Sequence, residues 1–254
     1  VQREIGSLAY ALQQAGQVGE AERLWREVVD ARETEYGHTN QLTLGSRFGL
    51  ARMLVEQEQQ KKVDEGLSML EEIVALNQQQ LGPGQWFTLD TQFWLGRAYE
   101  LKGDTNRTAA LYTEIFPRIL KFLPIDAAQF CSSRIADFFV RQKQFTQAKA
   151  VFSSIYKAMP SHLPDGALVF QRLLRAIAAA EGWSAAAQFC SANIDCLPQS
   201  AFPWLQKAWI FRYVGDDENY RQVVAKALAA AKHIGTNDQH VLIEIAALAK
   251  MQLS

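Results

Sequence analysis

The stretch LGRAYELKGDTNRTAALYTEI, residues 95–115, decides the fold of this chain. A small residue, Gly96, is followed three positions later by bulky Tyr99. Thr108 comes twelve positions after Gly96, and Tyr112 follows four positions further on. On a helix, residues three or four positions apart share a face, and a small residue lets a neighbouring helix approach while a large one fills the space beside it. The spacing predicts two antiparallel helices packed against each other.

Three other segments repeat this pattern, at residues 8–28, 50–73 and 135–155. Each begins with an aliphatic residue and a small one, and each has a second small residue with a large apolar residue four positions later. In the segment 50–73 the second small residue, Gly66, comes fifteen positions after the first, because three residues are inserted. We find no sustained alternation of the kind that marks strands. The chain is therefore predicted to be all-α and built from repeated helix pairs.

Two of these segments carry a family resemblance. The residues are Leu95-Gly96-x-x-Tyr99, Ala148-x-x-x-Phe152 and Pro160. They resemble the tetratricopeptide repeat. The resemblance covers at least residues 2–160 and continues more weakly to the end of the chain. It implies a right-handed superhelical α-solenoid of about six helix pairs with a C-terminal capping helix.

This resemblance predicts three regions. Residues 1–160 hold four well-formed repeats, residues 161–236 hold two degenerate repeats, and residues 237–254 form the capping helix. The register of the fifth repeat stays open, because either Ala185 or Ala186 can take the small position.

The repeat length narrows the resemblance. The small residues Ala9, Ala51, Gly96 and Ala136 are 42, 45 and 40 positions apart, longer than the common unit of about 34 residues. The linkers at 36–44 and 81–89 also share a glycine and a Thr-Leu pair. Such repeats and linkers are similar to the kinesin light chain branch, which implies cytoskeletal or cargo partners. Light-chain-like repeats are common in bacteria, so we expect a bacterial source.

Composition excludes several classes of protein. The 254 residues are 48% hydrophobic and 21% charged, as in a globular protein, and the net charge of −1 lacks the basic excess of a nucleic-acid binder. No apolar run approaches the ~18 residues of a membrane span. Three cysteines, without paired spacing, indicate a reducing compartment, so we expect a cytoplasmic protein. Residues 1–100 hold 15 acidic and 9 basic residues, and the rest of the chain has a basic excess. This uneven distribution indicates either ordinary solvated helix faces or two binding surfaces of different charge.

Catalytic signatures are missing from the sequence. The four histidines are scattered, and no phosphate-binding loop, nucleophile elbow, zinc-protease motif or kinase motif is present. We therefore expect no catalytic residue, no cofactor and no metal site.

An α-solenoid usually binds its partners along the groove lined by the first helix of each repeat. Positions one and four or five residues after the small residue are predicted to face this groove. They include Tyr10, Gln13, Arg52, Arg97, Glu100, Asp137, Arg141, Arg175, Trp209, Arg212 and Tyr213. Arg52 and Arg97 hold the same position in successive repeats. Their guanidinium groups could together hold a carboxylate or a peptide backbone, unless they are solvated or paired within the chain.

The favoured function is a non-catalytic scaffold that binds a peptide or a partner helix, of cytoskeletal or signalling type, in this groove. The alternative is the regulatory region of a larger bacterial enzyme. The chain begins at Val1 rather than Met, and residues 215–221 resemble C-terminal repeats of bacterial serine/threonine kinases. A small-ligand or RNA-binding protein is disfavoured by the near-neutral charge. Self-association into a homo-oligomer is compatible with either function.

Overall fold

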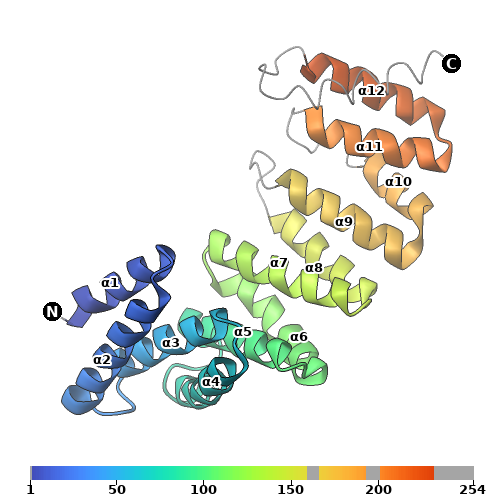
Figure 1. Cartoon of the computed structure of the whole chain (residues 1–254). Coiled ribbons are helices and arrows are strands. Elements are labelled where there is room, and N and C mark those ends of the chain that lie inside the picture. The colour runs from blue at the N-terminus through green and yellow to red at the C-terminus, as the bar shows by residue number, and fades with distance from the viewer. Residues whose placement is uncertain (1, 159–165, 193–200, 232–254) are drawn as a thin grey trace. The chain divides into compact units, whose positions relative to one another are not determined.

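The computed structural model describes residues 2–158, 166–192 and 201–231 (Figure 1). Every regular element in these ranges is a helix. The first six are α1 (Gln2–Gln14), α2 (Val18–Tyr36), α3 (Gln41–Glu56), α4 (Gln60–Gln80), α5 (Trp86–Leu101) and α6 (Thr105–Phe122). The other six are α7 (Ile125–Arg141), α8 (Phe145–Ala158), α9 (Gly166–Glu181), α10 (Trp183–Ala192), α11 (Ala201–Val214) and α12 (Asp217–Ala231). The prediction of an all-α chain with about six helix pairs is confirmed.

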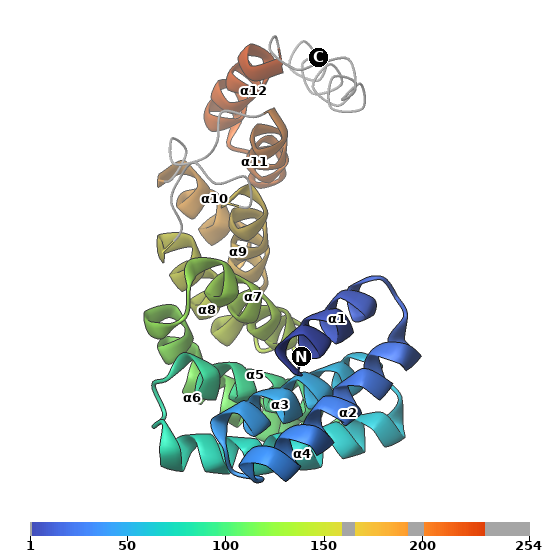
Figure 2. The ribbon, with the colours of Figure 1, turned by 90° about the vertical axis from the view of Figure 1, so that its left-hand side faces the viewer.

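The chain forms two compact units, residues 1–124 and residues 125–254. In the first unit, α1 packs on α2, α3 on α4 and α5 on α6, while α2 and α4 pack against the following helix and α3 also packs on α5 (Figure 2). In the second unit, α7 packs on α8, α9 on α10 and α11 on α12. The predicted regions, with boundaries after residues 160 and 236, remain a proposal, and the capping helix falls outside the described residues.

Small residues set the approach of the paired helices. A Cβ atom at Gly96 of α5 would lie 2.3 Å from Cε1 of Tyr112 of α6, which is fully buried. A Cβ atom at Gly66 of α4 would lie 2.9 Å from the carbonyl oxygen of Ala51 of α3. Since real Cβ contacts are longer, glycine is required at both places, and the late small residue of the second repeat has its predicted packing role.

The fifth repeat has the register that places Ala186 at the small position. Ala186 is fully buried, whereas Ala185 is half-buried. Cys190, four positions after Ala186, is also fully buried and takes the large apolar position.

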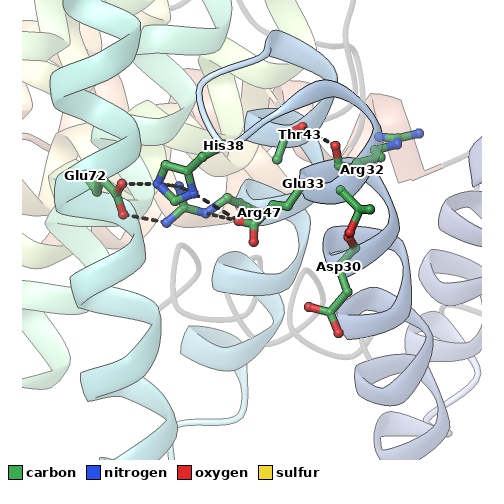
Figure 3. Close-up of polar contacts among 8 residues, drawn as sticks. Asp30, Arg32, Glu33, His38, Thr43, Arg47 and Glu72 are labelled. Carbon is green, nitrogen blue, oxygen red and sulfur yellow. Dashed lines mark hydrogen bonds and ion pairs between the residues drawn. The ribbon is translucent and has the colours of Figure 1, made fainter.

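A polar network holds the linker between α2 and α3 in place (Figure 3). His38, in the linker between α2 and α3, places Nδ1 3.1 Å from Glu33 of α2 and places Nε2 beside Glu72 of α4. Arg47 of α3, whose side chain is only 7% exposed, pairs with Glu72 and lies 3.6 Å from Glu33. The hydrogen bond from Arg47, aided by His38 and opposed by burial, lowers the pKa of Glu72 to about 2. His38 and Arg47 together thus join α2, α3 and α4.

Candidate functional site: the faces of the first helices

An open groove of about 550 Å³ lies between α7 and α9 in the second unit. We call it the α7–α9 groove. Its lining residues are Asp126, Gln129, Phe130, Ser133, Arg134, Asp137, Arg141, Val169 and Arg172. The residues from α7 recur every three or four positions, so they share one face of that helix. The groove is therefore made by the first helices of two consecutive repeats.

The α7–α9 groove combines charge with an exposed aromatic ring. Asp137 of α7 accepts a hydrogen bond from Nη1 of Arg172 of α9 at 3.1 Å, which ties the two helices together. The guanidinium of Arg134 lies 5.5 Å from the centroid of the Phe130 ring, and that ring is 47% exposed. With three arginines and two aspartates, the lining has a net positive charge. Such a surface suits binding through both apolar and ionic contacts.

The groove contains part of what the sequence predicted in the second unit. Asp137 and Arg141 belong to the lining, and Arg175 is exposed on α9 but lies outside it. Sequence analysis did not select Phe130 or Arg134. The signal for them was available, because they come six and two positions before the small residue of their repeat, on the face already assigned to the groove.

The first unit has an equivalent surface, which we call the α1–α3–α5 face. The guanidinium of Arg52 of α3 lies 4.9 Å from the Trp94 ring centroid on α5 and 6.0 Å from that of Tyr10 on α1. Nε of Arg52 donates to Glu56 at 3.0 Å, and Gln13 of α1 donates to the other oxygen of Glu56. The predicted residues Tyr10, Gln13 and Arg52 therefore meet on one surface.

Arg97 and Glu100 of α5 also meet. Nη2 of Arg97 lies 2.8 Å from Glu58 in the loop after α3, and Nη1 lies 3.1 Å from Glu100. Arg52 and Arg97 were expected to offer two donor groups to one anion. Each is paired instead with carboxylates of its own chain, which leaves the α1–α3–α5 face with more acidic than basic groups.

Asp90 of α5 is a further titratable group on this face. Its side chain is half-buried, and it takes part in no hydrogen bond or ion pair among the described residues. Burial raises the pKa of Asp90 to about 6, and the positive charge of Arg52 opposes this rise. Sequence analysis missed Asp90 because it considered only positions that follow the small residue.

Repeat positions relate the two surfaces. Asp90 precedes Gly96 by six positions, as Phe130 precedes Ala136, and Trp94 and Arg134 likewise correspond. Phe130 and Arg134 line the α7–α9 groove, and the matching positions of α5 lie on the corresponding side of that helix in the first unit. The same helix face thus has an acidic and aromatic character in one unit and a basic and aromatic character in the other.

The predicted residues of α11 lie apart from the groove lining. Arg212 donates to Asp217 at 3.3 Å. Tyr213 is 72% exposed, and its ring centroid lies 5.5 Å from that of Trp183. Trp209 lies on α11, and its side chain is outside the described residues.

The described residues include neither a metal-binding cluster nor a membrane-spanning helix. They contain no group of three or more His, Cys, Asp or Glu side chains that could hold a metal ion. None of the helices described in these ranges has the length and apolar character needed to cross a membrane.

Comparison with known proteins identifies the fold. No family model and no curated protein matches the chain. Crystal structures of nearly identical TPR-like repeats from a kinesin light chain-like protein of Podosopora anserina match with a TM-score of 0.63 and 23% identity, over 76% of this chain and 93% of theirs. The C-terminal part of a TPR repeat-containing protein from Cytophaga hutchinsonii matches with a TM-score of 0.60 and 15% identity, over 94% of this chain and 84% of that one.

The chain has the tetratricopeptide-repeat fold. In this fold, α1, α3, α5, α7, α9 and α11 are the first helices of six successive repeats. The α7–α9 groove and the α1–α3–α5 face are therefore both surfaces of first helices of tetratricopeptide repeats. They are the same kind of surface from which the sequence predicted binding.

Proposed function

We propose that this chain is a non-catalytic interaction scaffold that binds a segment of a protein partner along the first helices of its repeats. The observation that carries the proposal is the α7–α9 groove, with its exposed Phe130 and its arginines. A peptide or a helix can place an apolar side chain against Phe130 and polar groups against the charged lining.

The chemistry of both surfaces supports binding rather than catalysis. Asp137, Glu56 and Glu100 each form an ion pair with an arginine of the chain. Asp90 has a raised pKa, but the charged group that acts on it is Arg52, which cannot exchange a proton with it. These groups suit recognition and do not form an acid–base pair.

The proposal includes the class of partner. The kinesin light chain-like linkers and repeat lengths support a cytoskeletal or signalling partner in the cytoplasm. A fold match at 23% identity supports the architecture only, so the partner must be found by experiment.

The test is affinity capture followed by direct measurement. A partner is captured with the wild-type chain, purified, and titrated against the wild type, an Arg134→Glu/Arg141→Glu variant and an Arg221→Glu control. Arg221 is exposed on α12 and lies outside the groove lining. We expect the groove variant to bind about tenfold more weakly or worse, because two attractive charges become repulsive, while the control binds as the wild type does.

Equal affinity of the groove variant and the wild type would overturn the groove assignment. Capture of a catalytic domain from the same parent protein would favour the alternative, in which these repeats regulate an enzyme. Capture of a second copy of the chain would make the groove a site of self-association.

A further inference from the structure

We propose that Asp90 anchors a cationic side chain, an arginine or lysine of the bound partner segment, on the α1–α3–α5 face. This inference rests on the proposed function, since it assumes that a segment binds along the first helices. It assigns the chemistry of that segment at one position of the first unit.

Asp90 holds the same repeat position as a residue of the α7–α9 groove. Asp90 precedes Gly96 by the same six residues that separate Phe130 from Ala136. Phe130 lines the α7–α9 groove, so Asp90 holds on α5 the repeat position that contributes to a groove on α7. Trp94 lies one turn after Asp90 on the same helix, beneath the guanidinium of Arg52.

The Asp90 carboxyl has no hydrogen-bond or ion-pair partner among the described residues. In the part of the chain that the structure describes, the charged group that acts on it is Arg52 of α3, and Nε of Arg52 donates to Glu56. No charged group of α4 or α6, the helices packed on α5, contributes to its titration in the described part of the chain. Glu56 and Arg97 occupy the same face and are themselves paired.

The α1–α3–α5 face carries an excess of negative charge. Arg52, Glu56 and Asp90 together carry one net negative charge when all are ionised. Arg97 with its carboxylate partners Glu58 and Glu100 adds another. An incoming cation therefore compensates an excess charge, whereas an incoming carboxylate would meet repulsion.

Aromatic rings lie on the same face, beside Arg52. Tyr10 is 47% exposed and lies beside Arg52, whose own guanidinium already rests on Trp94. Flat aromatic faces attract cations, and arginine more often than lysine. The chain itself thus shows that a guanidinium is accommodated on this surface.

A proton must leave Asp90 before it can pair with a cation. Because its pKa is about 6, the carboxyl is ionised at pH 7.5 and largely protonated at pH 5. The affinity for a cationic segment should therefore fall by about tenfold between these pH values. The Asp90→Asn variant should lose this part of the pH dependence.

The experiment selects the ligand chemistry directly. Phage-displayed random dodecapeptides are selected at pH 7.5 on the whole wild-type chain, with removal of phage that also bind the Asp90→Asn variant. An exposed acid of α2 provides the matched control variant, Asp30→Asn. We expect selected peptides to share an arginine or lysine, to bind Asp30→Asn as they bind the wild type, and to bind Asp90→Asn about tenfold more weakly.

Synthetic versions of a selected peptide complete the test. Replacing its shared arginine or lysine with glutamine should weaken binding to the wild type as much as Asp90→Asn does, and should add no further loss to that variant. Far-ultraviolet circular dichroism of Asp90→Asn checks that the helices are retained.

The outcomes separate the two proposals. A parallel selection without the removal of phage that bind Asp90→Asn supplies the comparison. If it yields peptides that depend on Arg134 while the subtracted selection yields none, the Asp90 assignment is overturned and the scaffold function stands. Asp90-dependent peptides without a common cation would overturn the assignment too. Failure to recover any peptide that binds the first helices would count against both proposals.

Discussion

The guanidinium of Arg52 lies over the Trp94 ring, 4.9 Å from its centroid, and so joins the second repeat to the third. The corresponding contact between the fourth and fifth repeats is the 3.1 Å hydrogen bond between Asp137 and Arg172. In each case one residue directly follows the small position of its repeat. The contact between the first helices of consecutive repeats is thus a cation–π contact in the first unit and an ion pair in the second.

The Arg52–Trp94 contact should stabilise the first unit measurably. We expect a double-mutant cycle with Arg52→Gln and Trp94→Leu to give a coupling free energy of about 1 kcal/mol, the size of a partly desolvated cation–π contact. Urea denaturation of the four proteins supplies the free energies of unfolding. A coupling near zero would show that the two groups are merely adjacent.

Gly96 should tolerate no side chain. Its Cβ atom would lie 2.3 Å from the buried ring of Tyr112, so Gly96→Ala is expected to cost about 1–3 kcal/mol through overpacking. Gly19→Ala is the control, because no atom beyond its chain neighbours and the adjoining backbone of its own helix lies within 4 Å of its Cβ position, and alanine favours helix α2. Thermal unfolding distinguishes them: a Gly96→Ala protein as stable as the control would contradict the close approach of α5 and α6.

Asp90 should make stability depend on pH. Its pKa is about 6 in the folded chain against 3.8 for the free group, so folding favours the protonated form. The contribution of Asp90 to stability should therefore fall by roughly 2 kcal/mol as the pH rises from 4 to 7, and Asp90→Asn should be more stable than the wild type at pH 7 only. Denaturation at both pH values tests this, and a difference that does not vary with pH would refute it.

The Arg47 network should respond in the opposite direction. The pKa of Glu72 is lowered to about 2 from 4.5, so its contribution is present above pH 4.5 and is lost as the pH falls towards 2. Glu72→Gln should be less stable than the wild type at pH 6, with the gap closing at pH 2.5. Chemical denaturation at these two pH values is the measurement, and a constant gap would rule out the ion pair as its cause.

Arg47→Gln tests the same network from its buried member. The substitution leaves Glu33 and Glu72 without their guanidinium partner, and it should cost about 2–3 kcal/mol. Arg23→Gln is the matched control, since Arg23 is exposed and pairs with Glu27 one turn away, and it should cost less than about 0.5 kcal/mol. Similar losses in the two variants would show that the buried position of Arg47 adds nothing.

The fold could be predicted because helix packing leaves a periodic record in the sequence. The small Gly96 and the large Tyr112 must stand at a fixed spacing for their two helices to pack together. Each repeat has the same small and large positions. The register of the fifth repeat could not be predicted, because Ala185 and Ala186 are both small and only their burial distinguishes them.

The candidate site was less predictable. The spacing rule identified the helix face of Arg52 and Arg97, but not their partners, since Trp94 and Glu58 come from other repeats or loops. The burial of Asp90 depends on neighbouring helices and leaves no local signal in the sequence. Sequence periodicity therefore does not predict the contacts between repeats.

The contacts Arg52–Trp94 and Asp137–Arg172 each take one residue from either side of the border between repeats. Recombination at that border would separate the two members and leave a mismatched pair in the chimera. A crossover inside a helix pair, for example at the turn 102–104 between α5 and α6, would transfer the whole contact. The contacts between first helices are thus inherited in blocks that are out of phase with the repeats themselves.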